Sequence, residues 1–243
     1  MVLPIADENE PGRGLAYVTL ALIAANILVF VLLQQLTAEN PFTYGFSAIP
    51  LEITTSTDLV QPIPVTIQGQ SYLLPEAPGP SPIQLTLLSS MFMHANLLHI
   101  GGNMLFLWIF GDNVEHRLGR VAYLLAYLAA GVVGSLAQIL SSPESVIPSL
   151  GASGAISGVL GAYIVLFPRN RVTAILLRIL VQVPAVVAIG LWIAFQVLSS
   201  IGTDPAQGGV AYLAHIGGFA LGVVVGFVFR LIPTAPASRP AGP

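Results

Sequence analysis

The sequence contains no cysteine and no lysine, and charged residues of every kind make up only 8% of its 243 positions. The absence of cysteine excludes disulfide bridges and gives no indication of the redox compartment. The scarcity of charge, together with 55% hydrophobic residues and a mean hydropathy of +0.83, excludes the profile of an ordinary soluble globular domain. The composition therefore predicts a protein that crosses a membrane several times.

Six apolar segments account for this composition. An α-helix needs about 20 residues to cross a hydrocarbon core roughly 30 Å thick. The candidate segments are Leu15–Leu36, Leu97–Gly111, Val121–Leu140, Gly151–Phe167, Ile179–Gly202 and Gly209–Phe229. The first has an acidic leader and is too long for the apolar region of a signal peptide, so we expect it to be retained. The predicted fold class is an all-α polytopic membrane protein, a bundle of six transmembrane helices over residues 15–232.

The basic residues, all of them arginines, predict the topology. They are Arg13, Arg117, Arg120, Arg169, Arg171, Arg178, Arg230 and Arg239. With the N-terminus in the cytoplasm, six helices leave every arginine on the cytoplasmic side, as the positive-inside rule requires. Residues 1–14 and the Pro-rich residues 233–243 then form cytoplasmic tails. The connection over residues 37–93 has no basic residue and many prolines, so we expect a long external loop there.

Four polar side chains inside the apolar segments are predicted to lie at a similar depth. Counting 1.5 Å per residue from the arginine near the end of each helix puts Ser153 and His215 roughly 22–24 Å above the cytoplasmic edge. The same count gives about 21 Å for Asn103 and about 27 Å for His99. Polar groups at this depth are costly and are tolerated around a hydrated cavity. Serine, histidine and amide groups form acyl-transfer sites, so we expect such a site just below the outer surface.

Small residues at four-residue spacing predict that two of the helices pack closely together. One stripe consists of Ser153, Ser157 and Gly161, and the other of Gly218, Gly222 and Gly226. Such stripes let helices approach closely in lipid, and in many membrane helices they serve packing alone. His215 lies three residues before Gly218 and therefore on the same helix face. The helix contact would also point His215 toward Ser153.

Taken one at a time, the polar residues have simpler interpretations. A serine in a membrane helix usually bonds to its own backbone, and a lone histidine can serve an interhelical hydrogen bond or a proton pathway. Ser149 and Ser157 are weaker candidates for a nucleophile than Ser153, and a structural role is favoured for His94. Glu115 and Arg117 are expected to form an ion pair or a cap at the cytoplasmic end.

Taken together, the motifs resemble those of the rhomboid family of intramembrane serine proteases. Gly151-Ala152-Ser153-Gly154 matches the family's GxSG motif, and Ala214-His215 followed by Gly218 and Gly222 matches AHxxGxxxG. The HxxxxHxxxN motif is matched by His94, His99 and Asn103, and the ExR motif by Glu115 and Arg117. GxSG alone is a weak signal, whereas the combination over roughly Leu15 to Arg230 is highly specific.

The resemblance implies a serine endopeptidase that cleaves single-pass transmembrane proteins near their outer ends. Ser153 would be the nucleophile and His215 the general base, while His99, Asn103 and backbone groups near Ser153, with Gly151 among them, would stabilise the oxyanion. The resemblance implies no metal, no cofactor and no nucleic acid; the partners would be the substrates and membrane lipid. The expected location is a prokaryotic plasma (inner) membrane.

Two departures from the family pattern affect this interpretation. The external loop has no Trp-Arg pair, and Ser157 stands where better-known members carry a tyrosine that stacks on the histidine. Support for His215 must then come from elsewhere, through Tyr212 or a hydrogen bond. No carboxylate lies at the depth of the site, so we expect a Ser-His dyad in place of a triad.

Two rival interpretations come from other functional classes. The first is a proteolytically inactive rhomboid-fold protein that binds membrane proteins or serves in their quality control; loss of the serine or the histidine would favour it, and both are present. The second is a small transporter with a histidine proton relay, which predicts intramembrane carboxylates and repeated halves. Neither feature is evident in the sequence.

Overall fold

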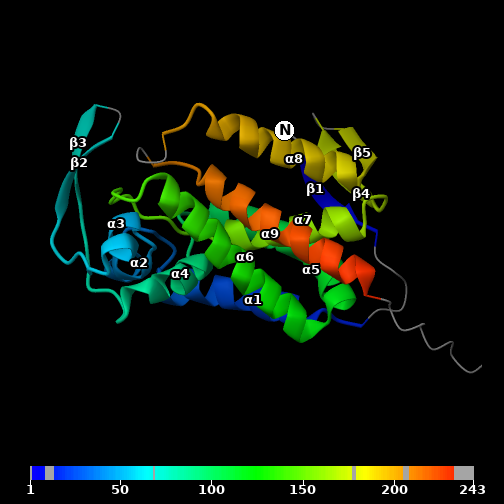
Figure 1. The fold of residues 1–243 in the computed structure, drawn as a ribbon, viewed down its shortest axis with the longest axis horizontal. Helices are drawn as coiled ribbons and strands as arrows, with labels where there is room; N and C mark the ends of the chain where they lie inside the picture. The colour runs from blue at the N-terminus through cyan, green and yellow to red at the C-terminus, as the bar shows by residue number, and fades with distance from the viewer. Residues whose placement is uncertain (1, 9–13, 68, 177–178, 205–207, 233–243) are drawn as a thin grey trace, which may run out of the picture.

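Helices form most of the structure. The computed structural model describes residues 2–8, 14–67, 69–176, 179–204 and 208–232. The long helices are α1 (Tyr17–Leu28) with its π-helical continuation η1 (Val29–Leu33), α5 (Leu97–Leu118), α6 (Arg120–Ser141), α7 (Ser153–Leu166), α8 (Ala185–Ser200) and α9 (Tyr212–Leu231). They run along the long axis of the molecule (Figure 1). The predicted tail over residues 233–243 lies outside the described residues, as do Arg13, Arg178 and Arg239.

Two of the described helices, α6 and α9, are long and apolar enough to cross a membrane by length and composition. The apolar helices α7, α8 and α1 with η1 are shorter. The predicted arrangement of six spanning helices is therefore supported only in part by the described helices. Helix α5 ends at Leu118, not at Gly111 as predicted, because the polar residues of its last turns form contacts with neighbouring segments.

The predicted helix over Ile179–Gly202 is wrong at its N-terminal end. Residues Ile179–Pro184 form strand β5, and α8 begins only at Ala185. Val181 and Val183 are half-buried and alternate with exposed residues, which is the period-two pattern of a strand. Strand β5 pairs in antiparallel register with β4 (Arg171–Leu176). Pro184 ends this strand directly before α8, where it interrupts no helical hydrogen bond.

A third strand comes from the predicted N-terminal tail. Residues Val2–Asp7 form β1, which pairs antiparallel with β4 and gives the strand order β1-β4-β5 in the described part of the chain. Asp7 Oδ2 accepts hydrogen bonds from Tyr163 Oη at 2.5 Å and from Asn113 Nδ2 at 2.8 Å. Burial raises the pKa of Asp7 to about 6. These contacts attach the start of the chain to α5 and α7.

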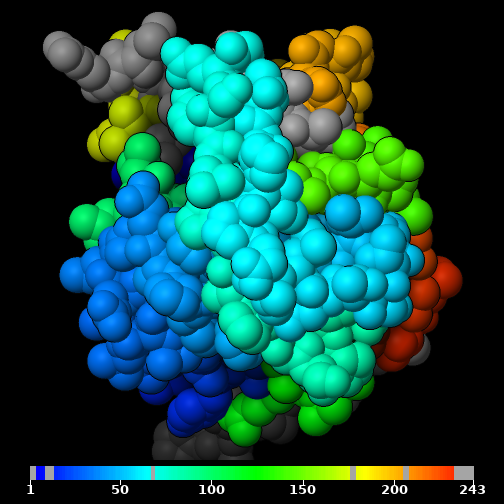
Figure 2. All heavy atoms as spheres, turned by 90° about the vertical axis from the view of Figure 1, so that its left-hand side faces the viewer, coloured from blue at the N-terminus to red at the C-terminus, as the bar shows by residue number. Residues whose placement is uncertain are grey.

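Residues 37–93 contain regular structure of their own. They form α2 (Pro41–Phe46), α3 (Pro50–Thr55), a hairpin of β2 (Ile63–Ile67) and β3 (Gln70–Leu74), η2 (Ile83–Leu85), α4 (Thr86–Ser89) and η3 (Ser90–Phe92). An antiparallel bridge between Ala48 and Ser149, and a bond from the Leu51 N–H to the Ser145 carbonyl, attach this segment to the α6–α7 connection. The segment covers the middle of one end of the molecule (Figure 2).

Helix α7 is the central helix, and every residue from Gly154 to Tyr163 is buried. It packs against α9 (Figure 1) with almost no side-chain volume between the two backbones. A Cβ added at Gly218 would overlap the Gly154 carbonyl, and one at Gly222 would overlap the Gly158 carbonyl. The close packing that the two small-residue stripes predict is thus confirmed, and it fixes the start of α7 against the start of α9.

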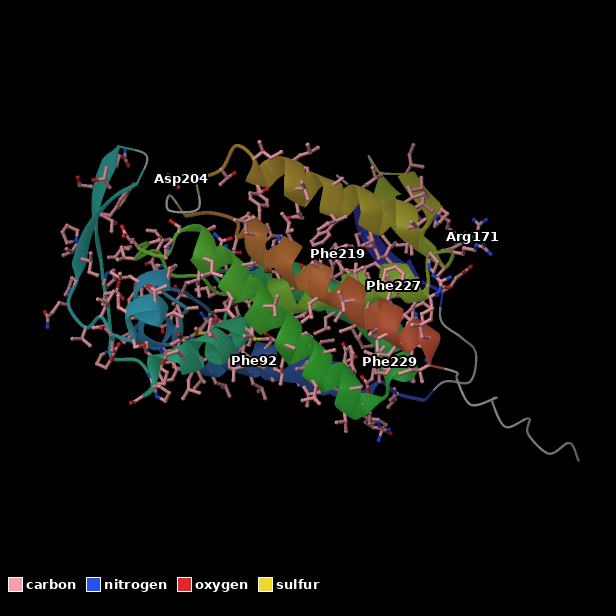
Figure 3. All side chains as sticks on the ribbon, in the orientation of Figure 1. Phe92, Arg171, Asp204, Phe219, Phe227 and Phe229 are labelled. Atoms are coloured by element: carbon pink, nitrogen blue, oxygen red, sulfur yellow. The ribbon has the colours of Figure 1, made fainter. Side chains whose placement is uncertain are left out.

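Three arginines lie at one common end of the helices. Arg117 at the end of α5 donates to the carbonyls of Phe229 and Ile232 at the end of α9. Arg120 at the start of α6 lies 4.6 Å from the ring centroid of Tyr17 at the start of α1. Arg171 of β4 lies at the same end of the molecule as Phe229 (Figure 3). The topology prediction requires the arginines to lie on one side of the membrane, and the common end of these three agrees with it. That this end is the cytoplasmic one stays a prediction.

Candidate active site

A cavity of about 640 Å³ opens between the helices near the end covered by residues 37–93. Its walls come from α5, α7, α8 and α9, from the connection between α6 and α7, and from residues just before α9. Four of the predicted site residues line it: His99, Asn103, Ser153 and His215. Segments far apart in the sequence thus bring these side chains together.

Ser153 and His215 are in direct contact across the α7–α9 interface. Ser153 is the first residue of α7, and His215 lies in the first turn of α9. The Oγ of Ser153 lies 2.8 Å from the Nε2 of His215, a good hydrogen-bond distance. The glycine contacts between α7 and α9 bring the two helix starts this close. The pair has the distance that a serine nucleophile and its general base require.

The other ring nitrogen of His215 decides which tautomer the contact uses. Nδ1 lies 2.8 Å from the amide Oε1 of Gln196 on α8. An amide oxygen can only accept, so Nδ1 carries the proton and Nε2 of the neutral ring is left as an acceptor. The Ser153 hydroxyl therefore donates to His215. This is the direction of proton transfer that activates a serine.

Gln196 is not among the site residues predicted from the sequence. The available signal was a polar amide inside a long apolar segment, the same signal that marked Ser153 and His215. The indole of Trp192, one turn before Gln196, also lies beside the His215 ring, with ring centroids 5.9 Å apart and an interplanar angle of 33°. Tyr212, which sequence reasoning offered as a support, lines the cavity. The described contacts to the His215 ring from outside the dyad are those of Gln196 and Trp192.

His99 and Asn103 bring N–H donors to the same cavity. His99 Nδ1 accepts from the Ala95 N–H at 3.3 Å, so the ring proton of the neutral side chain is on Nε2. A Cβ built on Gly151 would lie 3.0 Å from that Nε2 and 3.6 Å from the Ser153 Oγ, which places the donor beside the serine. The buried Nδ2 of Asn103 has no hydrogen-bond partner. A buried donor without a partner is costly unless a ligand supplies the acceptor.

Gly151 does not have the place that sequence reasoning gave it. Its N–H donates to the Ser90 carbonyl at 2.9 Å and is therefore occupied, so it is no oxyanion donor in this conformation. Its φ of +133° belongs to a region that side chains rarely adopt, and an added Cβ would lie 2.9 Å from the His99 ring. Gly151 is required because the His99 ring occupies the space beside it.

Comparison with known proteins decides the family. The family model of the Rhomboid domain matches residues 84–232, which is more than half of the chain and includes every residue of the cavity named above. The chain belongs to the rhomboid family. Members of this family are integral membrane proteins.

Curated relatives come from several kinds of organism. Rhomboid protein 1, mitochondrial, of Saccharomyces cerevisiae is 35% identical over 153 residues, covering 59% of this chain and 41% of the relative. Rhomboid protease GluP of Bacillus subtilis is 38% identical over 140 residues, covering 58% of this chain and 26% of the relative. The human presenilin-associated rhomboid-like protein, mitochondrial, is 30% identical over 171 residues, covering 70% of this chain and 38% of the relative. This rhomboid chain thus spans less than half the length of each of these three relatives, and their mixed origin does not support a prokaryotic plasma membrane in particular.

The remaining motif residues of this rhomboid chain form structural contacts. The Ser157 hydroxyl donates to the Ser153 carbonyl at 2.6 Å, which is the ordinary bond of a serine to its own helix. His94 is fully buried and its ring lies edge-on to His99, with centroids 5.1 Å apart. The Glu115 carboxylate accepts from the backbone N–H groups of Val18 and Thr19 and so caps the start of α1. Of the two roles predicted for Glu115, the cap is present.

Proposed function

We propose that this chain is an intramembrane serine endopeptidase with Ser153 as nucleophile and His215 as general base. The observation that carries the proposal is the 2.8 Å contact between the Ser153 Oγ and the His215 Nε2, in a cavity that also holds an unpaired amide donor. Membership of a family with a relative named as a protease gives further support. A proteolytically inactive rhomboid-fold protein would have no need of an activated serine.

The proposed reaction follows from the positions of these groups. Ser153 Oγ attacks the scissile carbonyl while its proton passes to Nε2 of His215. The C–N bond then breaks, and His215 returns the proton to the leaving amine. A water molecule then attacks the acyl carbon while its proton passes to His215. The bond between the acyl carbon and the Ser153 Oγ breaks, His215 returns the proton to Oγ, and the carboxylic acid product leaves. Among the described residues that line the cavity there is no carboxylate, which agrees with a dyad.

The oxyanion of the tetrahedral intermediate would be stabilised by three donors. Nε2–H of His99 and Nδ2–H of Asn103 come from α5. The N–H of Ser153 is the third donor, because the first N–H groups of a helix have no partner within it and point along the positive end of its dipole. Donors fixed before the reaction in a site of low dielectric are the most effective kind.

The proposed membrane arrangement puts α1 with η1 and α5 to α9 across the bilayer, with both termini cytoplasmic and residues 37–93 outside. The contacts of Arg117 and Arg120 at one common end of the helices support it. The opposite end carries the cavity, lined there by Pro50, Ser145 and Gly208 from outer connections. The substrate would then be a single-pass transmembrane protein cut near its outer end, with a small residue before the scissile bond.

The proposal is tested with purified protein, a transmembrane substrate and a fluorophosphonate probe. Ser153→Ala should abolish cleavage and labelling because the attacking oxygen is removed. Ser200→Ala is the matched control: its hydroxyl bonds to the Val197 carbonyl of its own helix, away from the cavity, and activity should be retained. Cleavage by the Ser153→Ala protein would refute the assignment, and a wild-type protein that neither cleaves nor labels would favour the inactive alternative.

A further inference from the structure

Gln196 is the polar residue through which α8 reaches the active site. Helix α8 buries Ala185, Ile189 and Gln196, and only the last of these carries a polar side chain. Gln196 is 6% exposed, so its amide requires partners inside the protein. It finds one in the Nδ1 of His215, at 2.8 Å.

This contact selects one form of a ring that has two neutral tautomers. With the proton on Nδ1, bonded to the Gln196 oxygen, Nε2 is free to take the serine proton. With the proton on Nε2, the ring would donate a hydrogen bond to the Ser153 Oγ and could not take the proton from the hydroxyl. In serine proteases with a triad, a buried aspartate holds the histidine in the productive tautomer. Gln196 stands at the corresponding ring nitrogen here.

We propose that Gln196 is a positioning residue that fixes the tautomer and the orientation of His215, completing a Ser153-His215-Gln196 arrangement. The proposal rests on the proposed serine endopeptidase function and deepens it. A neutral amide suits this place because a buried carboxylate in an apolar helix would need a compensating charge. The described lining of the cavity provides none, since its ionisable side chains are His99, Tyr212 and His215.

Trp192 acts with Gln196 on the same ring. Its indole covers one side of the imidazole, with centroids 5.9 Å apart, and is itself packed against Phe106 of α5 at 6.4 Å. Gln196 therefore controls the direction of the imidazole in its plane, and Trp192 limits its tilt. Both groups belong to α8, so the packing of α8 against α9 determines whether His215 is ready to accept a proton.

Two substitutions separate positioning from simple packing. Gln196→Leu keeps the volume and removes the acceptor, which leaves Nδ1–H buried and unpaired; kcat should fall about 10-fold to 100-fold with little change in KM. Gln196→Glu keeps an acceptor and adds negative charge when ionised. It should retain more activity than Gln196→Leu, and the acid limb of its kcat/KM profile should move to higher pH, because the carboxylate favours the charged imidazolium.

The control pair is Gln182→Leu and Gln182→Glu. Gln182 lies on β5, away from the cavity, where its amide contacts Thr173, so neither substitution should change kcat or the pH profile. A second readout does not depend on the substrate. Histidine ¹⁵N spectra should show His215 protonated on Nδ1 in the wild type and mixed tautomers in Gln196→Leu, with the signal identified by its loss in His215→Ala.

The outcomes distinguish this inference from the proposed function. Wild-type kcat in Gln196→Leu, together with an unmoved acid limb in Gln196→Glu, would overturn the role of Gln196 while Ser153 still reacts with the fluorophosphonate. So would a single unchanged His215 tautomer in Gln196→Leu. If Ser153 of the wild type did not react at all, the proposed function itself would fail, and the role of Gln196 with it.

Discussion

Gly134 on α6 offers a sensitive test of the geometry, because it touches the backbone on both sides of the dyad. A Cβ added there would lie 2.5 Å from the Ala214 carbonyl oxygen and 3.4 Å from the Gly154 Cα. Ala214 precedes His215, and Gly154 follows Ser153. Ordinary van der Waals contact begins at 3.4 Å, so the Ala214 oxygen must move by the difference, 0.9 Å, if α6 stays in place.

A displacement of this size has a predictable effect on turnover. The backbone that carries His215 would shift by a large fraction of the margin within which the 2.8 Å contact between the Ser153 Oγ and the His215 Nε2 remains a hydrogen bond, so we expect that contact to be disturbed. Misplacing a reacting group by about 1 Å typically costs on the order of 100-fold in rate. We therefore expect Gly134→Ala to lower kcat between about 10-fold and 100-fold.

Turnover of a transmembrane substrate in detergent measures this effect, with circular dichroism to establish that the helices remain folded. Gly190→Ala on α8 is the matched control. Nothing lies within 4 Å of a Cβ at Gly190, and the same change in the interior of a helix should leave kcat unaltered and stabilise slightly. A folded Gly134→Ala protein with wild-type kcat would refute the claim that this backbone contact holds the dyad in place.

Three further predictions concern the oxyanion site, pH and topology. Asn103→Ala should lower kcat about 100-fold to 1000-fold with little change in KM, since one oxyanion donor is lost; unchanged kcat would remove Asn103 from the site. Burial raises the pKa values of Glu52 and Glu76 from 4.5 to about 7. The folding free energy that these two carboxyl groups contribute is therefore fully present below pH 4.5 and is lost as the pH rises through 7. Glu76→Gln should therefore protect residues 37–93 from proteolysis at pH 8 and have no effect at pH 4, whereas equal protection at both would contradict this sign. A cysteine at Gly69 should react with an impermeant thiol reagent outside and one at Asn170 should not; the reverse pattern would invert the topology.

The sequence predicted the helices and the cavity residues where the signal was local or periodic. Apolar runs located α6 and α9 to within a few residues, and the glycine stripes predicted the α7–α9 contact. Depth counted from the arginines predicted that Ser153 and His215 share a layer, and the two side chains meet at 2.8 Å. Apolar runs and glycine stripes can be recognised in one helix at a time, and the depth estimate needs only the arginines at one end of each helix.

The features that were not predicted depend mainly on pairing between distant segments. Strand β5 is as apolar as a helix, and only its pairing with β4, which in turn pairs with β1, makes it a strand. The hairpin of β2 and β3 had a local signal that was overlooked: Ile63, Val65 and Ile67 alternate with other residues before Gly69, whose φ of +78° suits the turn. The N–H of Gly151 is occupied by Ser90, a contact that no spacing along the chain could reveal.

Peptide mass spectrometry of the fluorophosphonate adduct identifies the nucleophile directly. We expect one adduct, on Ser153, in the wild-type protein, and almost none in His215→Ala, because the hydroxyl then lacks the base 2.8 Å away. An adduct on another serine, or full labelling of Ser153 in His215→Ala, would contradict the assignment of Ser153 and His215 as nucleophile and base.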